Sequence, residues 1–248
     1  MNKERLFFRP IVYGIILIYI TLTYSTLALG NSIASMAYPE DHYFELVGAG
    51  SLLISAVLIF YSFIKIRRSS SKLRMPVIKQ LVYVGLIVLF VFGAGEEISW
   101  GQRIFNLKTP QFLMHDNTQE ELNLHNLSIF ENSDFFTADR IFDIFWFLFV
   151  VIIPVASLLF KPVKKLVSNL MPIIHWSIGP LFLFNYVWAK LAKLIYQGSY
   201  TFDRVPFKQA IQEIKESNYE ILFVLIGLFI LLDLNRSKIG ESNLSPTL

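Results

Sequence analysis

The sequence predicts an all-α fold, a polytopic transmembrane bundle of about six helices with a long, partly helical outer loop between the third and fourth. Three observations lead to this prediction. Hydrophobic residues make up 54% of the chain and charged residues only 17%, whereas a soluble domain carries about 25% charged residues. The apolar residues fall into runs close to the roughly 20 residues that cross a bilayer. Basic and acidic residues alternate between successive connections.

Apolar runs define the predicted spans, which are residues 10–29, 45–64, 80–98, 140–160, 171–190 and 219–235. They form one transmembrane domain, 1–236, with an outer loop over 99–139 and a polar cytoplasmic tail over 237–248. The first run follows a basic segment, as in a signal peptide, but it is too long for a signal-peptide core, so we expect an uncleaved helix. Pro180 should kink the fifth helix, because proline removes a backbone hydrogen bond.

The distribution of charge predicts the orientation. Most of the 22 basic residues lie before the first run and after the second, fourth and sixth runs, and most of the 19 acidic residues lie on the other side. Basic connections stay in the cytoplasm, so both termini are predicted there, with the protein in the cell inner membrane. The net charge of +3 therefore reflects topology, and the bilayer, not nucleic acid, is the predicted partner. Cysteine is absent, which excludes disulfides and thiolate metal sites.

Two adjacent acids, Glu96 and Glu97, carry the sharpest functional signal. They follow an unbroken apolar run over 81–94, and an ionised carboxylate at that depth is costly unless it is paired or hydrated. Neighbouring residues on a helix point about 100° apart. We therefore expect one acid to face the bundle and the other to reach the interface or Arg103. The alternative is a helix that ends in water with two solvated acids.

Two further acidic segments are predicted on the same, outer side. Glu45 begins a stripe of small residues on one helical face, and such residues let helices approach closely. The stripe continues with Gly48, Ser51 and Ser55, and the other segment contains Glu213, Glu216 and Glu220 on one face. Glu220 lies beside an apolar run and is the better functional candidate. The alternatives are helix capping for Glu45 and a solvated face for the other acids.

A metal site is one use of these carboxylates. Glu121 and His125 stand four residues apart in the outer loop, a spacing that places both on one helical face. With Glu45 and Glu97 they would make an oxygen-rich site with imidazole, which suits Mn, Fe or Zn. A hydrogen-bonded pair without metal is the alternative. Because a connection as long as 99–139 is usually functional, we interpret it as a lid over the polar site.

Three segments resemble a family of uncharacterised bacterial multi-pass membrane proteins. They are E-D-x-x-x-E over 40–45, G-E-E-x-S-W-G-Q-R over 95–103 and N-x-Q-x-E-x-N-L-H-N over 117–126. The resemblance covers roughly residues 38–130. It implies a membrane location and a shared polar site, and it implies no particular reaction.

Three functions fit these features. The first is an inner-membrane enzyme acting on a lipid or lipid-linked substrate, with Glu96 or Glu97 as ligand or general base and Arg103 holding an anionic headgroup. The second is a structural or regulatory protein that binds a protein partner, or a second copy, through the outer loop. The third is a proton- or cation-coupled transporter. The inner halves of the spans carry almost no charge and no inverted repeat is visible, which disfavours transport.

Overall fold

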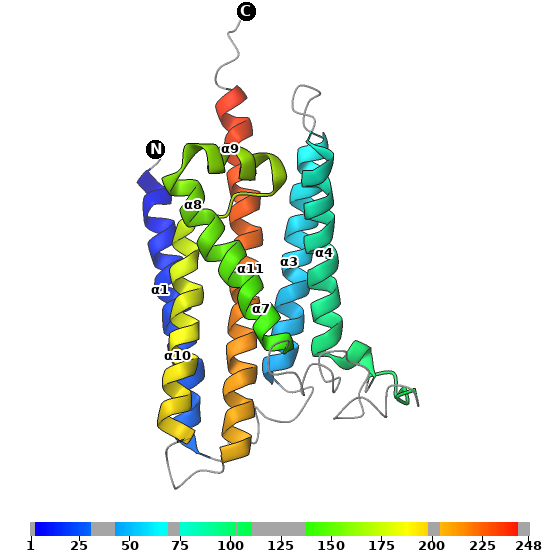
Figure 1. Ribbon diagram of the computed structural model, residues 1–248, viewed down its shortest axis with the longest axis vertical. Helices are drawn as coiled ribbons and strands as arrows, with labels where there is room; N and C mark the ends of the chain where they lie inside the picture. The colour runs from blue at the N-terminus through cyan, green and yellow to red at the C-terminus, as the bar shows by residue number, and fades with distance from the viewer. Residues whose placement is uncertain are drawn as a thin grey trace, which may run out of the picture. The chain divides into compact units, whose positions relative to one another are not determined.

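The computed structural model describes residues 3–30, 43–68, 75–102, 104–110, 137–197 and 204–242. Within these ranges the chain is helical and contains no strand, which confirms the predicted fold class (Figure 1). Six helices of the described residues are long and apolar enough to cross a membrane: Arg9–Leu29, Tyr43–Arg68, Val77–Glu97, Arg140–Leu159, Trp176–Tyr196 and Phe207–Leu234. The chain is therefore an integral multi-pass membrane protein.

The described helical elements follow one another along the chain. Their order is α1 (Lys3–Ser25), η1 (Thr26–Leu29), α3 (Tyr43–Arg68), α4 (Val77–Glu97), η2 (Ser99–Gly101), α7 (Ala138–Trp146), η3 (Phe147–Ile152), α8 (Ile153–Leu159), α9 (Lys161–Leu170), η4 (Trp176–Ile178), α10 (Gly179–Gln197) and α11 (Arg204–Ser242). The fourth span is continuous, because α7 passes into α8 through the π-helical turns of η3. The part of the outer loop over 111–136 lies outside the described residues.

The last two spans differ from the prediction. Pro180 lies in the first turn of α10, where its missing N–H would have had no helical partner, so it begins this helix instead of kinking it. The sixth span starts at Phe207 and not near 219, and α11 continues to Ser242, inside the predicted tail. The helix extends upstream because Phe207, Ile211 and Ile214 form a fully buried apolar face between the polar residues.

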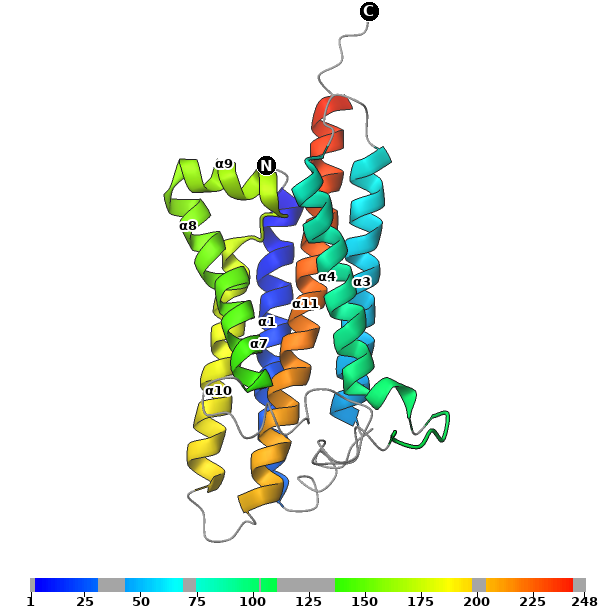
Figure 2. The ribbon, with the colours of Figure 1, turned by 45° about the vertical axis from the view of Figure 1, so that its right-hand side comes forward.

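The chain divides into two compact units. Unit one consists of Met1–Gly48 and Gly179–Leu222, and in it α1 and α10 run side by side in both ribbon views (Figures 1 and 2). Its core is aromatic. The rings of Phe182 and Tyr219 stack with centroids 5.4 Å apart.

Unit two consists of Ala49–Ile178 and Phe223–Leu248. Phe223 lies at its aromatic centre, with its ring centroid 4.9 Å from that of Phe90 and 6.2 Å from that of Phe145. Close helix packing comes from Gly227, where a Cβ would lie 3.0 Å from the Cβ of Leu58. In the same unit, α9 turns across the end of α8 (Figure 2).

Candidate functional site

The end of α4 places one carboxylate inside the protein. Glu96 is only 7% exposed, whereas Glu97, the last residue of the helix, is half-buried. The indole Nε1 of Trp100 donates a hydrogen bond to Oε1 of Glu96 at 2.7 Å. The prediction that one acid of this pair faces the interior is confirmed. The role of Glu96 as a base or ligand stays a prediction.

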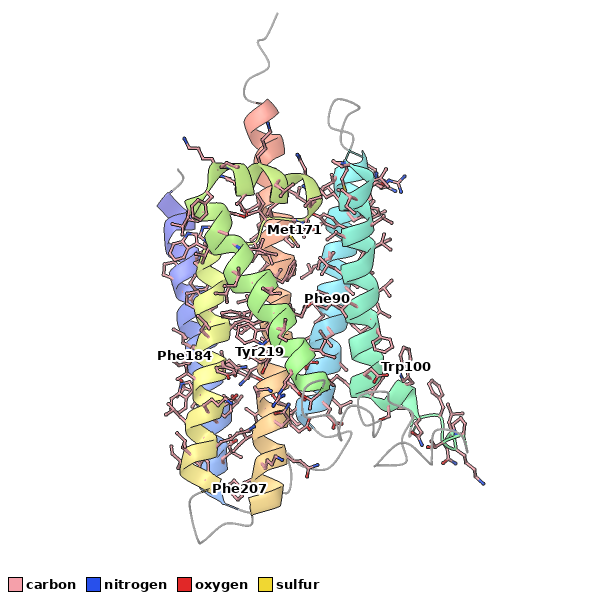
Figure 3. The ribbon with its side chains drawn as sticks, in the orientation of Figure 1. Phe90, Trp100, Met171, Phe184, Phe207 and Tyr219 are labelled. Atoms are coloured by element: carbon pink, nitrogen blue, oxygen red, sulfur yellow. The ribbon has the colours of Figure 1, made fainter. Side chains whose placement is uncertain are left out.

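A strained turn holds Trp100 in this position (Figure 3). Ser99, Trp100 and Gly101 have φ angles of 45°, 54° and 73°, a left-handed region that costs a residue with a Cβ about 1–2 kcal/mol. The turn folds the indole back onto α4. A Cβ on Gly95 would lie 2.9 Å from two carbons of the Trp100 ring, so glycine makes room for the ring.

This turn explains much of the G-E-E-x-S-W-G string. Gly95 accommodates the indole and Gly101 adopts the positive φ, while Glu96 receives the indole N–H. Sequence reasoning missed the hydrogen bond of Trp100. The available signal was the pair of glycines that flank an acid and a tryptophan within seven residues.

The predicted metal ligands are only partly within the described residues. Arg103, Glu121 and His125 lie outside them, so their proposed roles stay predictions. Among the described residues, no group of three or more His, Cys, Asp or Glu side chains is arranged to hold a metal ion. Just beyond the Trp100 turn, Gln102 donates to the buried hydroxyl of Thr109 at 2.7 Å, which ties back the start of the outer loop.

A second buried carboxylate belongs to unit one. Glu220 is 4% exposed, and its carboxylate carbon lies 2.8 Å from the position that a Cβ on Gly48 would occupy. Gly48 follows half-buried Glu45 by one helical turn, so the start of α3 carries both residues on one face. Ser51 and Ser55, farther along the stripe, are buried as well. The prediction that small residues give α3 a closely packed face is confirmed.

The interior of unit one also contains a polar network that the sequence did not reveal. Asn185 of α10 is fully buried and accepts hydrogen bonds from the Tyr24 hydroxyl at 3.0 Å and from Nδ2 of Asn218 at 3.1 Å. Its own Nδ2 donates to the Lys215 carbonyl at 2.8 Å. Asn218 also donates to the Thr23 hydroxyl at 3.0 Å. The network joins α1, α10 and α11. The signals that could have found it are Asn185 within the fifth apolar run and Asn218 just before the sixth.

A comparison with known proteins finds no family model, no curated protein and no solved structure that matches this chain. No family is therefore assigned to the chain from the resemblance of the three sequence segments. What stands is the class of protein, an integral multi-pass membrane protein, and function has to be inferred from the residues themselves.

Proposed function

We propose that this protein is an integral membrane enzyme that acts on a lipid or lipid-linked substrate through a carboxylate at the end of α4. The observation that carries the proposal is the burial of Glu96, 7% exposed at the end of a membrane-spanning helix. Ionisable groups at membrane depth are costly and mark functional sites. The Trp100 indole fixes the direction of the carboxylate, and a fixed orientation is what a general base or a ligand requires.

The proposed site extends from Glu96 to neighbours in the sequence. Half-buried Glu97 is next to it on α4, and Arg103 would bind the anionic headgroup of the substrate, since guanidinium pairs well with phosphate. In the metal-dependent form, Glu97, Glu121 and His125 hold Mn, Fe or Zn. The basic connections support an inner-membrane location with both termini in the cytoplasm and this site on the outer face.

Lipid turnover tests the proposal. The full chain, reconstituted in nanodiscs that contain a bacterial total lipid extract, is incubated and its lipids are compared by mass spectrometry with those of Glu96→Gln. Asp143→Asn is the matched control, because Asp143 is a half-buried span carboxylate that also accepts an indole N–H, from Trp146 at 2.9 Å. We expect one lipid class to change with wild type and Asp143→Asn and to stay constant with Glu96→Gln. If wild type leaves every lipid class unchanged, the proposal of a lipid enzyme is contradicted.

Elemental analysis tests the metal-dependent form separately. Purified wild type should contain stoichiometric Mn, Fe or Zn, and a Glu97→Ala/His125→Ala variant should lose it, because two of its ligands are gone. A metal-free wild type that still turns over lipid contradicts the metal and leaves the carboxylate mechanism standing.

A second candidate is a structural membrane protein, and the polar network of unit one favours it. Asn185 and Asn218 use their amides to hold α1, α10 and α11 together, which is how polar residues join helices in membranes. In that case no lipid changes with any variant, and Glu96→Gln alters only stability.

A further inference from the structure

The helix α9 is too short to cross a membrane, yet it lies between two spans. Its 10 residues extend about 15 Å, half of the hydrocarbon thickness. It follows the span that ends at Leu159 and precedes the one that begins at Trp176, so it lies at the membrane surface. We propose that α9 lies in the plane of the membrane and binds anionic phospholipid headgroups through its lysines.

The two faces of α9 differ sharply. Lys161, Lys164 and Lys165 are spaced three and four residues apart and are all exposed. Val163, Leu166, Val167 and Leu170 occupy the other face. Val167 is buried against the protein, whereas Leu166 is 60% exposed. A helix with a basic face and an apolar face that is only partly covered by protein is the kind that lies in the headgroup region.

The corner that leads into α9 adds apolar surface at the same place. Leu158, Leu159 and Phe160 are all exposed large hydrophobic residues, with Leu159 at 66%. Phe160 has an extended backbone, which breaks the helix between α8 and α9. Exposed apolar side chains beside exposed lysines fit a phospholipid, which offers acyl chains and a phosphate together.

The far end of α9 is fixed to another span of unit two. The Nζ of Lys79, near the start of α4, donates to the Ser168 carbonyl at 2.7 Å. Ser168 is in the last turn of α9, where carbonyls have no helical partner and a cation is favourable. Lys79 is thus a positioning residue that keeps the lysine face of α9 at the level where α4 begins.

Charge complementarity selects an anionic lipid as the occupant. No acidic residue occurs between Asp143 and Asp203, so the segment around α9 offers its own lysines no carboxylate partner. Anionic lipids attract such clusters near the membrane surface. A soluble phosphate would bind the lysines but would not cover the exposed leucines. An acidic protein surface would pair with the lysines but would not cover the apolar corner.

Lipid selectivity tests the proposal. The full chain in phosphatidylcholine bilayers is titrated with spin-labelled phosphatidylglycerol and, separately, spin-labelled phosphatidylcholine, and the motionally restricted fraction is measured by electron paramagnetic resonance. Wild type should prefer the anionic lipid, and Lys161→Gln/Lys164→Gln/Lys165→Gln should lose the preference, because each lysine near an anionic surface contributes roughly fivefold. The control variant replaces three other exposed lysines, Lys108, Lys190 and Lys208, by glutamine. It should keep the preference for the anionic lipid. Equal preference in both triple variants overturns the proposal.

The depth of α9 gives a measurement that does not depend on lipid selectivity. The chain contains no cysteine, so Leu166→Cys and Lys164→Cys can each carry a single nitroxide. The label at 166 should be more accessible to oxygen and the one at 164 more accessible to a water-soluble nickel complex. Water-like accessibility at both positions contradicts an in-plane helix. Loss of the lipid preference on adding inorganic phosphate would show an ion site instead of a lipid surface.

Discussion

The carboxylate of Glu220 lies against Gly48 of α3: its carboxylate carbon is 2.8 Å from the position that a Cβ on this glycine would occupy. The glycine thus allows a buried carboxylate of α11 to contact the backbone of α3 within unit one. Gly50, two residues later on the same helix, has open space at its Cβ position. The two glycines therefore differ in what they permit, and this difference can be measured.

Gly48→Ala should destabilise the protein by about 1–3 kcal/mol, because the new methyl group overlaps the Glu220 carboxylate in a packed interior. Gly50→Ala, the control, should be neutral or slightly stabilising, since alanine favours helices. Thermal unfolding in detergent, followed by tryptophan fluorescence, measures both. Adding Glu220→Ala to Gly48→Ala should recover part of the loss. Equal melting temperatures for the two alanine variants would show that Glu220 moves aside freely.

Trp100→Phe should cost about 1–3 kcal/mol, because it removes the N–H that donates to the buried Glu96 carboxylate. The phenyl ring still covers Gly95, so the loss reports the hydrogen bond. Trp176→Phe is the control. Both tryptophans are 46% exposed, and among the described residues no hydrogen bond of the Trp176 indole is found. Unfolding of the two variants under identical conditions measures the difference. A loss as large at Trp176 as at Trp100 would assign the effect to the ring and not to the hydrogen bond.

Asn185→Leu should destabilise unit one, because leucine has a similar size but makes none of the hydrogen bonds of Asn185. Tyr24→Phe removes one of its donors. In a double-mutant cycle of the two substitutions, we expect a coupling free energy of about 0.6 kcal/mol, the average for hydrogen bonds between membrane helices, and at most about 1.7 kcal/mol. Strictly additive losses would mean that Tyr24 and Asn185 do not stabilise each other.

The sequence was sufficient for the first four spans and for the burial of one of the two adjacent acids. Apolar length sets where a helix crosses lipid, and Glu96 follows the unbroken run over 81–94 so closely that one of the two adjacent acids is buried. The small residues from Gly48 to Ser55 likewise predicted a closely packed face, because packing distance depends on side-chain size.

Other features depend on individual side-chain contacts that hydrophobic periodicity does not predict. The left-handed conformations of Ser99 and Trp100 oppose local preference and are held by Gly95 and Glu96. The partners of Asn185 come from two other helices, and no periodicity in one helix predicts them. The early start of α11 was missed for a related reason: its polar residues hid a buried apolar face.

The predicted orientation can be read from single cysteines, because the chain has none of its own. Arg68→Cys at the end of α3 and Lys108→Cys beyond α4 change exposed residues on opposite sides of the third span. A membrane-impermeant maleimide should label position 108 in intact bacterial spheroplasts and position 68 only after permeabilisation, because basic connections stay in the cytoplasm. The reverse pattern would invert the topology and place the Glu96 site in the cytoplasm.

The shielding of the Glu96 position from water tests the account most directly. Glu96→Cys is labelled with a water-soluble maleimide in permeabilised membranes, and its rate is compared with that of exposed Lys108→Cys. We predict labelling at least about tenfold slower at position 96, the effect of an opening free energy of ~1.4 kcal/mol. Equal rates at the two positions would show that α4 ends in water, and the proposed carboxylate site would be contradicted.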